Sequence, residues 1–185
     1  MNTISETLNC KNICDERISK KLPVYNGGLG SNNIQQPSFF IESLKKFSNE
    51  KDYVSVRGIN ELQETIKNRF SNDTYSIDSV IVGNGLKELL FILQLSFEGT
   101  IFHITPSWVS YKEQILILNK ENNLIEIEST IENNFKIDHF KLDNIFTQYK
   151  TKNKLLIFNN PNNPTGILYT PYEVKKLAQV IKKHN

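Results

Sequence analysis

The glycines of the segment Ser79 to Phe91 (SVIVGNGLKELLF) stand between an apolar run and a helical pattern. Amides in the first turn of a helix have no intrahelical acceptor and lie at the positive end of the helix dipole, so a strand, a glycine turn and a helix start can together bind an anion. Gly85, Leu86 and Lys87 would present those amides. The segment has neither the spacing of a dinucleotide-binding fingerprint nor the Lys-Ser or Lys-Thr pair of a P-loop. Alone, it fits a structural turn as well as a phosphate site.

Two later loops also follow apolar runs and carry side chains that could meet a ligand. The segment Ile104 to Tyr111 (ITPSWVSY) contains Trp108, the only tryptophan. Because ligands of open α/β sheets bind outside the carboxyl ends of the strands, Trp108 could stack on a flat ring; the alternative is a tryptophan that closes the core. In Asn159 to Gly166 (NNPNNPTG), prolines and a glycine fix the backbone and Asn163 offers an amide donor, although a structural turn is equally compatible. Together the three loops could supply a phosphate cradle, a stacking face and a polar donor.

The elements that position these loops alternate in type along the chain. Residues 1–21 are polar and too weakly periodic to predict an amphipathic helix, so we interpret them as an arm. Ser38 is predicted to cap the first helix, and Thr170 with Pro171 to open the last. The predicted helices cover residues 38–47, 59–70, 86–97, 109–118, 139–149 and 171–184, and the predicted strands cover 79–83, 100–104, 123–128 and 154–158. Such alternation is typical of an α/β fold with parallel strands.

Length and composition limit the class of protein. The 185 residues, 38% of them hydrophobic, suffice for one ordinary core. A net charge of +2 gives no general attraction to nucleic acid or to an anionic membrane. There is no apolar run long enough to span a bilayer and no apolar core of a signal peptide near the amino terminus. We therefore predict a soluble cytoplasmic protein without nucleic-acid or membrane partners.

Cysteine and arginine usage narrows the kinds of site. Cys10 and Cys14 stand close together without a second pair or a histidine cluster, so we predict free thiols and no metal site. No arginine occurs after Arg69. Any anion site in the later part of the chain must therefore use backbone amides, lysines or hydroxyls.

The loops together resemble the class I and II aminotransferases, which are pyridoxal-phosphate enzymes of fold type I. The family signature Asn-Pro-x-Asn-Pro-Thr-Gly is similar to Asn159 to Gly166, with Asn160 in place of the first proline and Pro161 after it. The segments YVSVRGINELQETI, VGNGLKELLF and PSWVSY occur in the family's order, so the resemblance runs from Val24 to the last residue. It implies a partial fold type I large domain over residues 47–185, a parallel or mixed sheet with flanking helices. An amino-terminal arm and a segment leading into the small domain would precede it, over residues 1–46.

The resemblance also implies a pyridoxal 5'-phosphate site. Gly85, Leu86 and Lys87 would surround the phosphate of the cofactor. The cofactor ring would stack on Trp108, and Asn163 would donate a hydrogen bond to the phenolic oxygen of that ring. Tyr53 would reach the phosphate in the neighbouring subunit of a dimer, and Gly30 would lie beside the substrate carboxylate, where Trp108 and Asn163 also border the substrate. The bonds Thr105-Pro106 and Asn163-Pro164 would be cis.

Several features that the resemblance implies have no counterpart in these 185 residues, because in the family they lie after the proline-rich signature. They are the aspartate that pairs with the pyridine nitrogen, the lysine that forms the Schiff base, and the arginines that hold the phosphate and the substrate carboxylate. No lysine matches the Schiff-base position, and only nineteen residues follow Gly166. We therefore predict no catalytic residue and an inactive isolated chain. The interpretation is the amino-terminal half of an enzyme that transfers an amino group from an amino acid to a 2-oxo acid, acting as a homodimer or completed by a carboxy-terminal half. The alternative is a non-catalytic fragment that binds a phosphate-bearing ligand or a partner protein.

Overall fold

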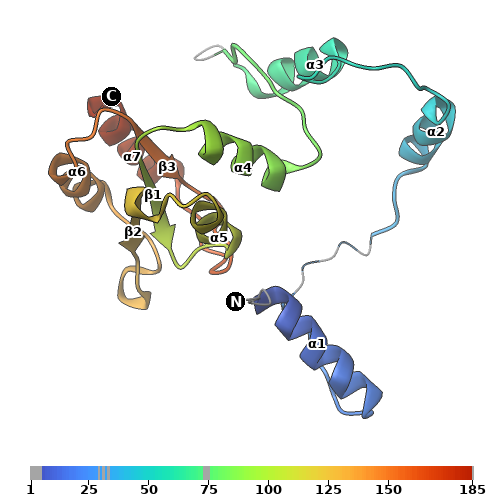
Figure 1. The fold of residues 1–185 in the computed structure, drawn as a ribbon, viewed down its shortest axis with the longest axis horizontal. Helices are drawn as coiled ribbons and strands as arrows, with labels where there is room; N and C mark the ends of the chain where they lie inside the picture. Colours follow the sequence, from blue (N-terminus) through green and yellow to red (C-terminus); the bar gives the residue numbers. More distant parts are fainter. Residues whose placement is uncertain (1–5, 29, 31, 33, 73–75, 185) are drawn as a thin grey trace. The chain divides into compact units, whose positions relative to one another are not determined.

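The chain divides into two units, Met1–Ser55 and Val56–Asn185, in the computed structural model of the protein (Figure 1). The structure describes residues 6–28, 30, 32, 34–72 and 76–184. The first unit contains α1 (Glu6–Ser19) and α2 (Ser38–Phe47). The predicted boundary between residues 46 and 47 concerns the domains of a whole aminotransferase and stays a prediction.

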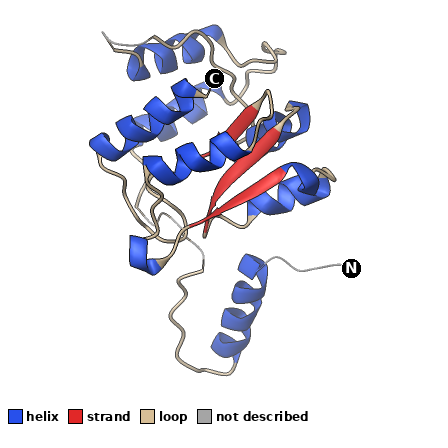
Figure 2. Cartoon of the chain, turned by 90° about the vertical axis from the view of Figure 1, so that its left-hand side faces the viewer, coloured by secondary structure: helices blue, strands red, loops and turns tan. Residues whose placement is uncertain are grey.

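The second unit is organised around three parallel strands. β1 (Thr100–Thr105) lies between β2 (Leu124–Glu128) and β3 (Lys154–Ile157), and Phe102 is in register with a residue on each side. Three of the four predicted strands and the α/β class are thus confirmed. Helices cover both faces of the strands in Figure 2. The remaining elements are α3 (Asn60–Phe70), α4 (Leu86–Ser96), α5 (Ser110–Ile117), the short 3-10 helices η1 (Glu121–Asn123) and η2 (Ile131–Asn133), α6 (His139–Gln148) and α7 (Pro171–Lys183).

The two faces of β1 differ in chemistry. Phe102 points into the main core, whose buried members come from the sheet, α6, α7 and the loops beside them: Ile127, Ile137, Leu142, Phe146, Tyr169, Leu177 and Val180. Neighbouring residues of a strand face opposite sides, so Ile101 and His103 lie on the other face, toward α4 and α5. This second face is the more polar one.

Local caps explain where the later helices begin. Asp138 accepts a hydrogen bond from the Lys141 amide at the start of α6, at 2.7 Å. At the start of α7, Thr170 and Glu173 form a capping box, as the predicted opening at Thr170 requires. Ser38 is the first residue of α2 and makes no capping bond, so its predicted role as the cap is wrong.

One of the predicted strands is corrected by the structure. Residues 79–83 belong to no strand, although Val82 donates its amide to the Arg57 carbonyl at 2.9 Å. An apolar run predicts burial, but a strand also needs a neighbour to pair with its amides. The predicted arm contains the helix α1, to which the ion pairs Lys11–Asp15 and Lys20–Glu16 contribute. Pairs four residues apart support a helix that lacks an apolar face.

The described part of the chain contains two cysteines but no cluster of metal ligands and no membrane-spanning helix. Cys10 and Cys14 are free thiols. In that part of the chain no three His, Cys, Asp or Glu side chains gather as metal ligands could. No helix there is both long and apolar enough to cross a bilayer.

A pair of phenylalanines tests the position of the main core. Phe102 is fully buried, whereas Phe140 on α6 is 68% exposed. We expect Phe102→Ala to lower the free energy of unfolding by about 3 to 5 kcal/mol, because it leaves a cavity. The matched Phe140→Ala change should cost no more than about 0.5 kcal/mol. Urea denaturation followed by circular dichroism measures both, and equal losses would contradict the assigned core.

Candidate functional site

The loops that follow the three strands leave the same edge of the sheet, because the strands are parallel. The carbonyl of Thr105, at the end of β1, accepts hydrogen bonds from the amide and the hydroxyl of Ser129, at 2.8 and 2.6 Å. The side-chain amide of Asn162, in the loop after β3, donates to the Pro106 carbonyl at 3.1 Å. Hydrogen bonds therefore tie the loops after β2 and β3 to the loop after β1.

The start of α4 has the features of an anion site. Gly85 precedes the helix with φ +122°, a conformation that favours glycine, and no side chain accepts the first-turn amides at this cap. A Cβ added at Gly83 would lie 2.8 Å from a Leu89 methyl carbon, so the Leu89 side chain would have to shift to accept it. The Glu88 carboxylate accepts the Asn84 amide at 2.9 Å. The amides of Leu86 and Lys87 remain available to an anion.

Trp108 lies in the loop between β1 and α5, beside the predicted site residue Lys87 and the buried Tyr111. The Lys87 Nζ is 5.5 Å from the centroid of the Trp108 ring, and the Tyr111 ring meets it edge-on at 5.6 Å. Trp108 is half-buried and is not a member of the main core. The structure thus places Trp108 beside Lys87 and outside the main core, and its role as a stacking face stays a prediction.

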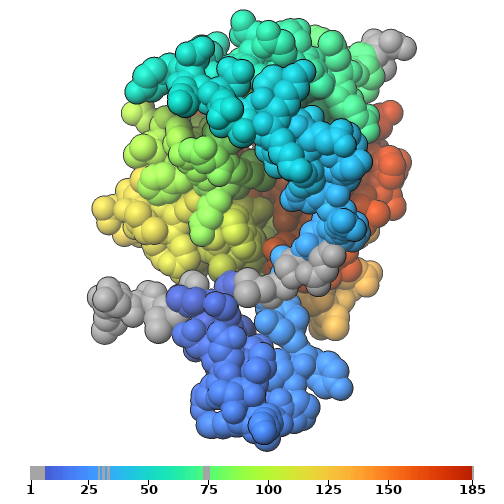
Figure 3. All heavy atoms as spheres, turned by 90° about the vertical axis from the view of Figure 1, so that its right-hand side faces the viewer, coloured from blue at the N-terminus to red at the C-terminus, as the bar shows by residue number. Residues whose placement is uncertain are grey.

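Two buried glutamines hold α4 against α5, and the sequence patterns did not identify them. Gln114 donates to the Lys87 carbonyl at 2.8 Å, and Gln94 donates to the Gln114 side-chain oxygen at 2.9 Å. At the other end of α4, the Lys120 ammonium donates to three carbonyls, those of Gln94, Leu95 and Phe97, each at 2.8 Å. A glutamine within an apolar helical stretch is the signal that could have indicated this network. Figure 3 shows the surfaces of α4 and α5, in green and yellow, side by side.

The loop after β3 holds the proline-rich signature. Residues 160–166 read Asn-Pro-Asn-Asn-Pro-Thr-Gly, so the signature is complete from Asn160 onward and the predicted departure at that residue is wrong. Thr105-Pro106 and Asn163-Pro164 are cis, as predicted, and Asn160-Pro161 is cis as well. Asn160 Oδ1 accepts the Tyr169 amide at 2.8 Å. Asn163 is exposed, and its carboxamide has no hydrogen-bond partner among the described residues.

Tyr53 and Gly30 belong to the first unit. The Tyr53 side chain is fully exposed, and a side chain added at Gly30 would meet no atom within 4 Å. Their predicted contacts with a neighbouring subunit's cofactor and with a substrate carboxylate stay predictions.

A polar cluster lies on the face of the sheet toward α5. His103 is 1% exposed, and its Nε2 is 3.1 Å from Glu126 Oε1, while Lys112 donates to the other Glu126 oxygen at 2.7 Å. The His103 Nδ1 is buried and has no hydrogen-bond partner among the described residues. Burial lowers the pKa of His103, and the Lys112 hydrogen bond lowers the pKa of Glu126.

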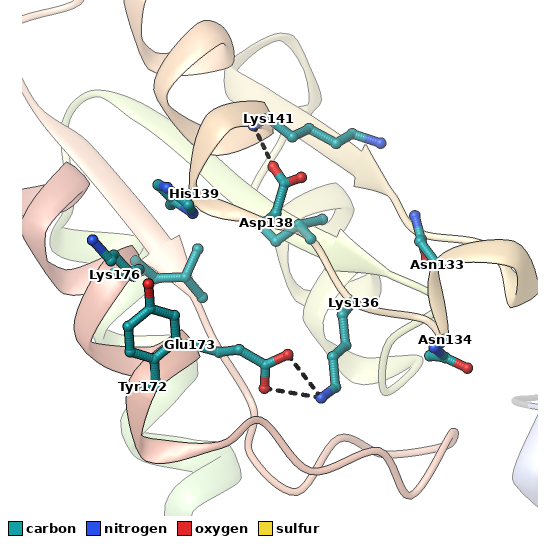
Figure 4. A pocket seen from close by; sticks show the side chains of 11 residues that line it. Asn133, Asn134, Lys136, Asp138, His139, Lys141, Tyr172, Glu173 and Lys176 are labelled. Atoms are coloured by element: carbon teal, nitrogen blue, oxygen red, sulfur yellow. Dashed lines mark hydrogen bonds and ion pairs between the residues drawn. The ribbon is translucent and has the colours of Figure 1, made fainter.

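A hollow of about 290 Å³ lies elsewhere, between the loop after η2 and the starts of α6 and α7 (Figure 4). Its charged groups already have partners: Lys136 binds the Glu173 carboxylate at 3.0 and 2.9 Å, and Asp138 caps α6. The carboxylates of Asp138 and Glu173 thus lie at the starts of α6 and α7. None of the predicted site residues lines the hollow, so we place the candidate site at α4 and the loops.

Comparisons with known proteins show which family the chain resembles. Residues 28–185 match the family model described as aminotransferase class I and II. An aspartate aminotransferase of Bacillus subtilis is 32% identical over 166 residues, covering 85% of this chain and 41% of that protein. A probable aspartate/prephenate aminotransferase of Rickettsia bellii is 35% identical over 138 residues, covering 71% and 33%.

Solved structures show the same fold. An aspartate aminotransferase from Rhizobium meliloti has a TM-score of 0.81 at 22% identity, over 99% of this chain and 46% of that one. A Thermus thermophilus aspartate aminotransferase with maleate has a TM-score of 0.80 at 22% identity, over 99% and 49%. The chain therefore spans less than half the length of these relatives.

The buried His103 should make the stability of the folded chain depend on pH. The unfolded chain protonates His103 near its ordinary pKa of 6.5, whereas the folded chain resists protonation, so the unfolded state binds more protons just below this pH. The free energy of unfolding should fall as the pH drops through 6.5, before Glu126 begins to lose its contribution below its ordinary pKa of 4.5. His103→Gln should flatten this slope, and the control His139→Gln should keep it. Urea titrations at several pH values measure the slope; an unchanged slope in His103→Gln would contradict the assignment.

Proposed function

The chain belongs to the class I and II aminotransferase family, and on that premise we propose that it forms the amino-terminal part of an enzyme transferring amino groups from an amino acid to a 2-oxo acid. The observation that carries the proposal is the open start of α4 beside the Lys87 and Trp108 pair. Free amides, an ammonium group and an aromatic face suit a phosphorylated planar ring, and pyridoxal 5'-phosphate is such a group.

Each residue of the candidate site has a proposed role. Gly85, Leu86 and Lys87 hold part of the phosphate through helix amides and a lysine. Trp108 covers one face of the ring and excludes water from it. Asn163 donates to the phenolic oxygen and favours its ionised form, because a hydrogen bond to a charged group lowers its pKa. When bound, the cofactor supplies a ring that withdraws electrons from the reacting carbon.

The residues of the first unit complete the proposal. Gly30 leaves space beside the substrate carboxylate, where Trp108 and Asn163 also border the substrate, and Tyr53 reaches the phosphate bound by a second subunit. The dimer, a completing carboxy-terminal half and a cytoplasmic location stay predictions. The alternative, a non-catalytic binding fragment, is not favoured, because the similarity to aminotransferases extends over most of the chain and beyond the phosphate loop.

We propose further that the 185 residues alone do not catalyse transamination. None of their lysines matches the residue that binds the cofactor aldehyde in the family. That amine also serves as the base that moves the proton, so its loss removes two functions at once.

Binding of pyridoxamine 5'-phosphate tests the cofactor site without side reactions at lysines. We expect calorimetry to show saturable binding at one site per chain, and much weaker binding of pyridoxamine, which lacks the phosphate. Lys87→Met should weaken binding by about 3- to 10-fold, as expected for one charge-assisted contact. The control Lys175→Met, on an exposed position of α7, should stay within about 2-fold of the unaltered chain. Equal effects of both changes would contradict the assigned phosphate site.

Borohydride reduction tests the proposed inactivity. After incubation with pyridoxal 5'-phosphate, peptide mapping should find labels spread over exposed lysines and no stoichiometric label at one position. Assays with aspartate and 2-oxoglutarate should show no turnover above that of free cofactor. One fully labelled lysine together with turnover would overturn the proposal.

A further inference from the structure

We propose that Asn162 is a positioning residue that holds the loop carrying Asn163 against the loop carrying Trp108. This inference rests on the proposed function, in which those two side chains contact the same ligand ring. Asn162 itself would not touch the ligand. It would act by fixing the separation of its two neighbours.

The hydrogen bonds of Asn162 join two segments far apart in the sequence. Its Nδ2 donates to the Pro106 carbonyl at 3.1 Å and to Thr165 Oγ1 at 2.9 Å. A primary amide has two N–H groups, so both are used. The side chain is half-buried, which strengthens hydrogen bonds relative to those in open water.

Each of the two loops is held by hydrogen bonds of its own, so a single bond between them can set their spacing. The Gly166 amide donates to the Asn162 carbonyl at 2.7 Å, and the Asn162 amide donates to the Ile167 carbonyl at 2.9 Å. Asn163 lies inside this closed turn and must move with it. On the other loop, Pro106 is two residues before Trp108 and follows Thr105, which Ser129 holds.

The sheet does not fix this spacing. The pairing of β1 with β3 ends at His103 and Ile157, before either loop begins. Among the described residues, the bond from Asn162 to Pro106 is the hydrogen bond that connects the loop after β3 with the loop after β1. Losing it would let Asn163 and Trp108 move independently while the sheet stays intact.

Two substitutions separate this bond from the bond within the turn. In Asn162→Asp, the carboxylate can accept from the Thr165 hydroxyl, which restores a bond within the turn, but it cannot donate to the Pro106 carbonyl and repels it. The bond between the loops is therefore lost. In Thr165→Val, the shape is kept and the bond to Pro106 remains, while the bonds within the turn, including the 3.4 Å bond from the Ile167 amide, are lost. Thr165→Val is therefore the matched control, and Asn162→Ala removes both bonds.

Trp108 is the only tryptophan, so the fluorescence of the chain reports on this loop. Without ligand, Asn162→Asp and Asn162→Ala should make Trp108 more accessible to acrylamide, and Thr165→Val should not. Asn162→Asp and the uncharged Asn162→Ala should both weaken binding of pyridoxamine 5'-phosphate, Asn162→Ala by about 3- to 10-fold as expected for one hydrogen bond, and Thr165→Val should weaken it by less than about 2-fold. Thermal melting followed by circular dichroism verifies that each variant folds.

Several outcomes would overturn the positioning role. The role would be contradicted if Asn162→Asp showed the same acrylamide quenching of Trp108 and the same affinity for pyridoxamine 5'-phosphate as the unaltered chain. Equal effects of Asn162→Asp and Thr165→Val would also contradict it, because they would assign the effect to the turn alone. If Asn162→Asp fails to fold while Thr165→Val folds, Asn162 is a folding residue and the proposal is also lost. If the unaltered chain binds no pyridoxamine 5'-phosphate but Asn162→Asp still exposes Trp108, the positioning role stands and the proposed cofactor binding by this chain fails.

Discussion

The central position of β1 constrains the rest of the second unit. A strand with neighbours on both sides and helices on both faces must divide its side chains between two environments. Phe102 faces the apolar layer of α6 and α7, whereas His103 faces the more polar layer of α4 and α5. Parallel pairing with β2 and β3 also places the three following loops at one edge. The apolar layer stabilises the sheet, and the polar layer and the edge are left for binding.

The start of α4, the proposed phosphate site, is held by hydrogen bonds more than by apolar burial. Several apolar side chains of α4 are exposed, with Leu86 at 71% and Leu95 at 54%. The helix is instead held by the two buried glutamines and by Lys120 at its carboxyl end. Hydrogen bonds have direction, so they fix the axial position and rotation of a helix better than apolar contact does. An anion site made of backbone amides needs such control, because its donors move with the helix.

Sequence patterns predicted the elements whose signals are local. The helix periodicities and the capping residues at Thr170 are contained within a few residues, and the structure confirms them. The segment 79–83 failed because a strand requires a partner that its own residues do not specify. The predicted Lys87 and Trp108 lie together, and the cis bonds at Pro106 and Pro164 follow the family resemblance. The glutamines and Asn162 were missed because their partners lie 20 to 56 residues away in the chain.

The asparagines of the signature loop differ in their hydrogen bonds. Asn160 and Asn162 bond to the protein, whereas the Asn163 carboxamide has no partner among the described residues. Asn160 uses its side-chain oxygen to anchor the chain at Tyr169, and Asn162 uses both N–H groups on Pro106 and Thr165. Both are thereby committed to holding the loop in place. Asn163 lies between cis prolyl bonds on an exposed turn and retains a carboxamide with no partner among the described residues. A polar group with its backbone fixed and its own hydrogen bonds unmade binds a ligand with little loss of conformational entropy. Asn160 and Asn162 therefore hold the loop in place and leave the Asn163 carboxamide free for its proposed contact with the ligand.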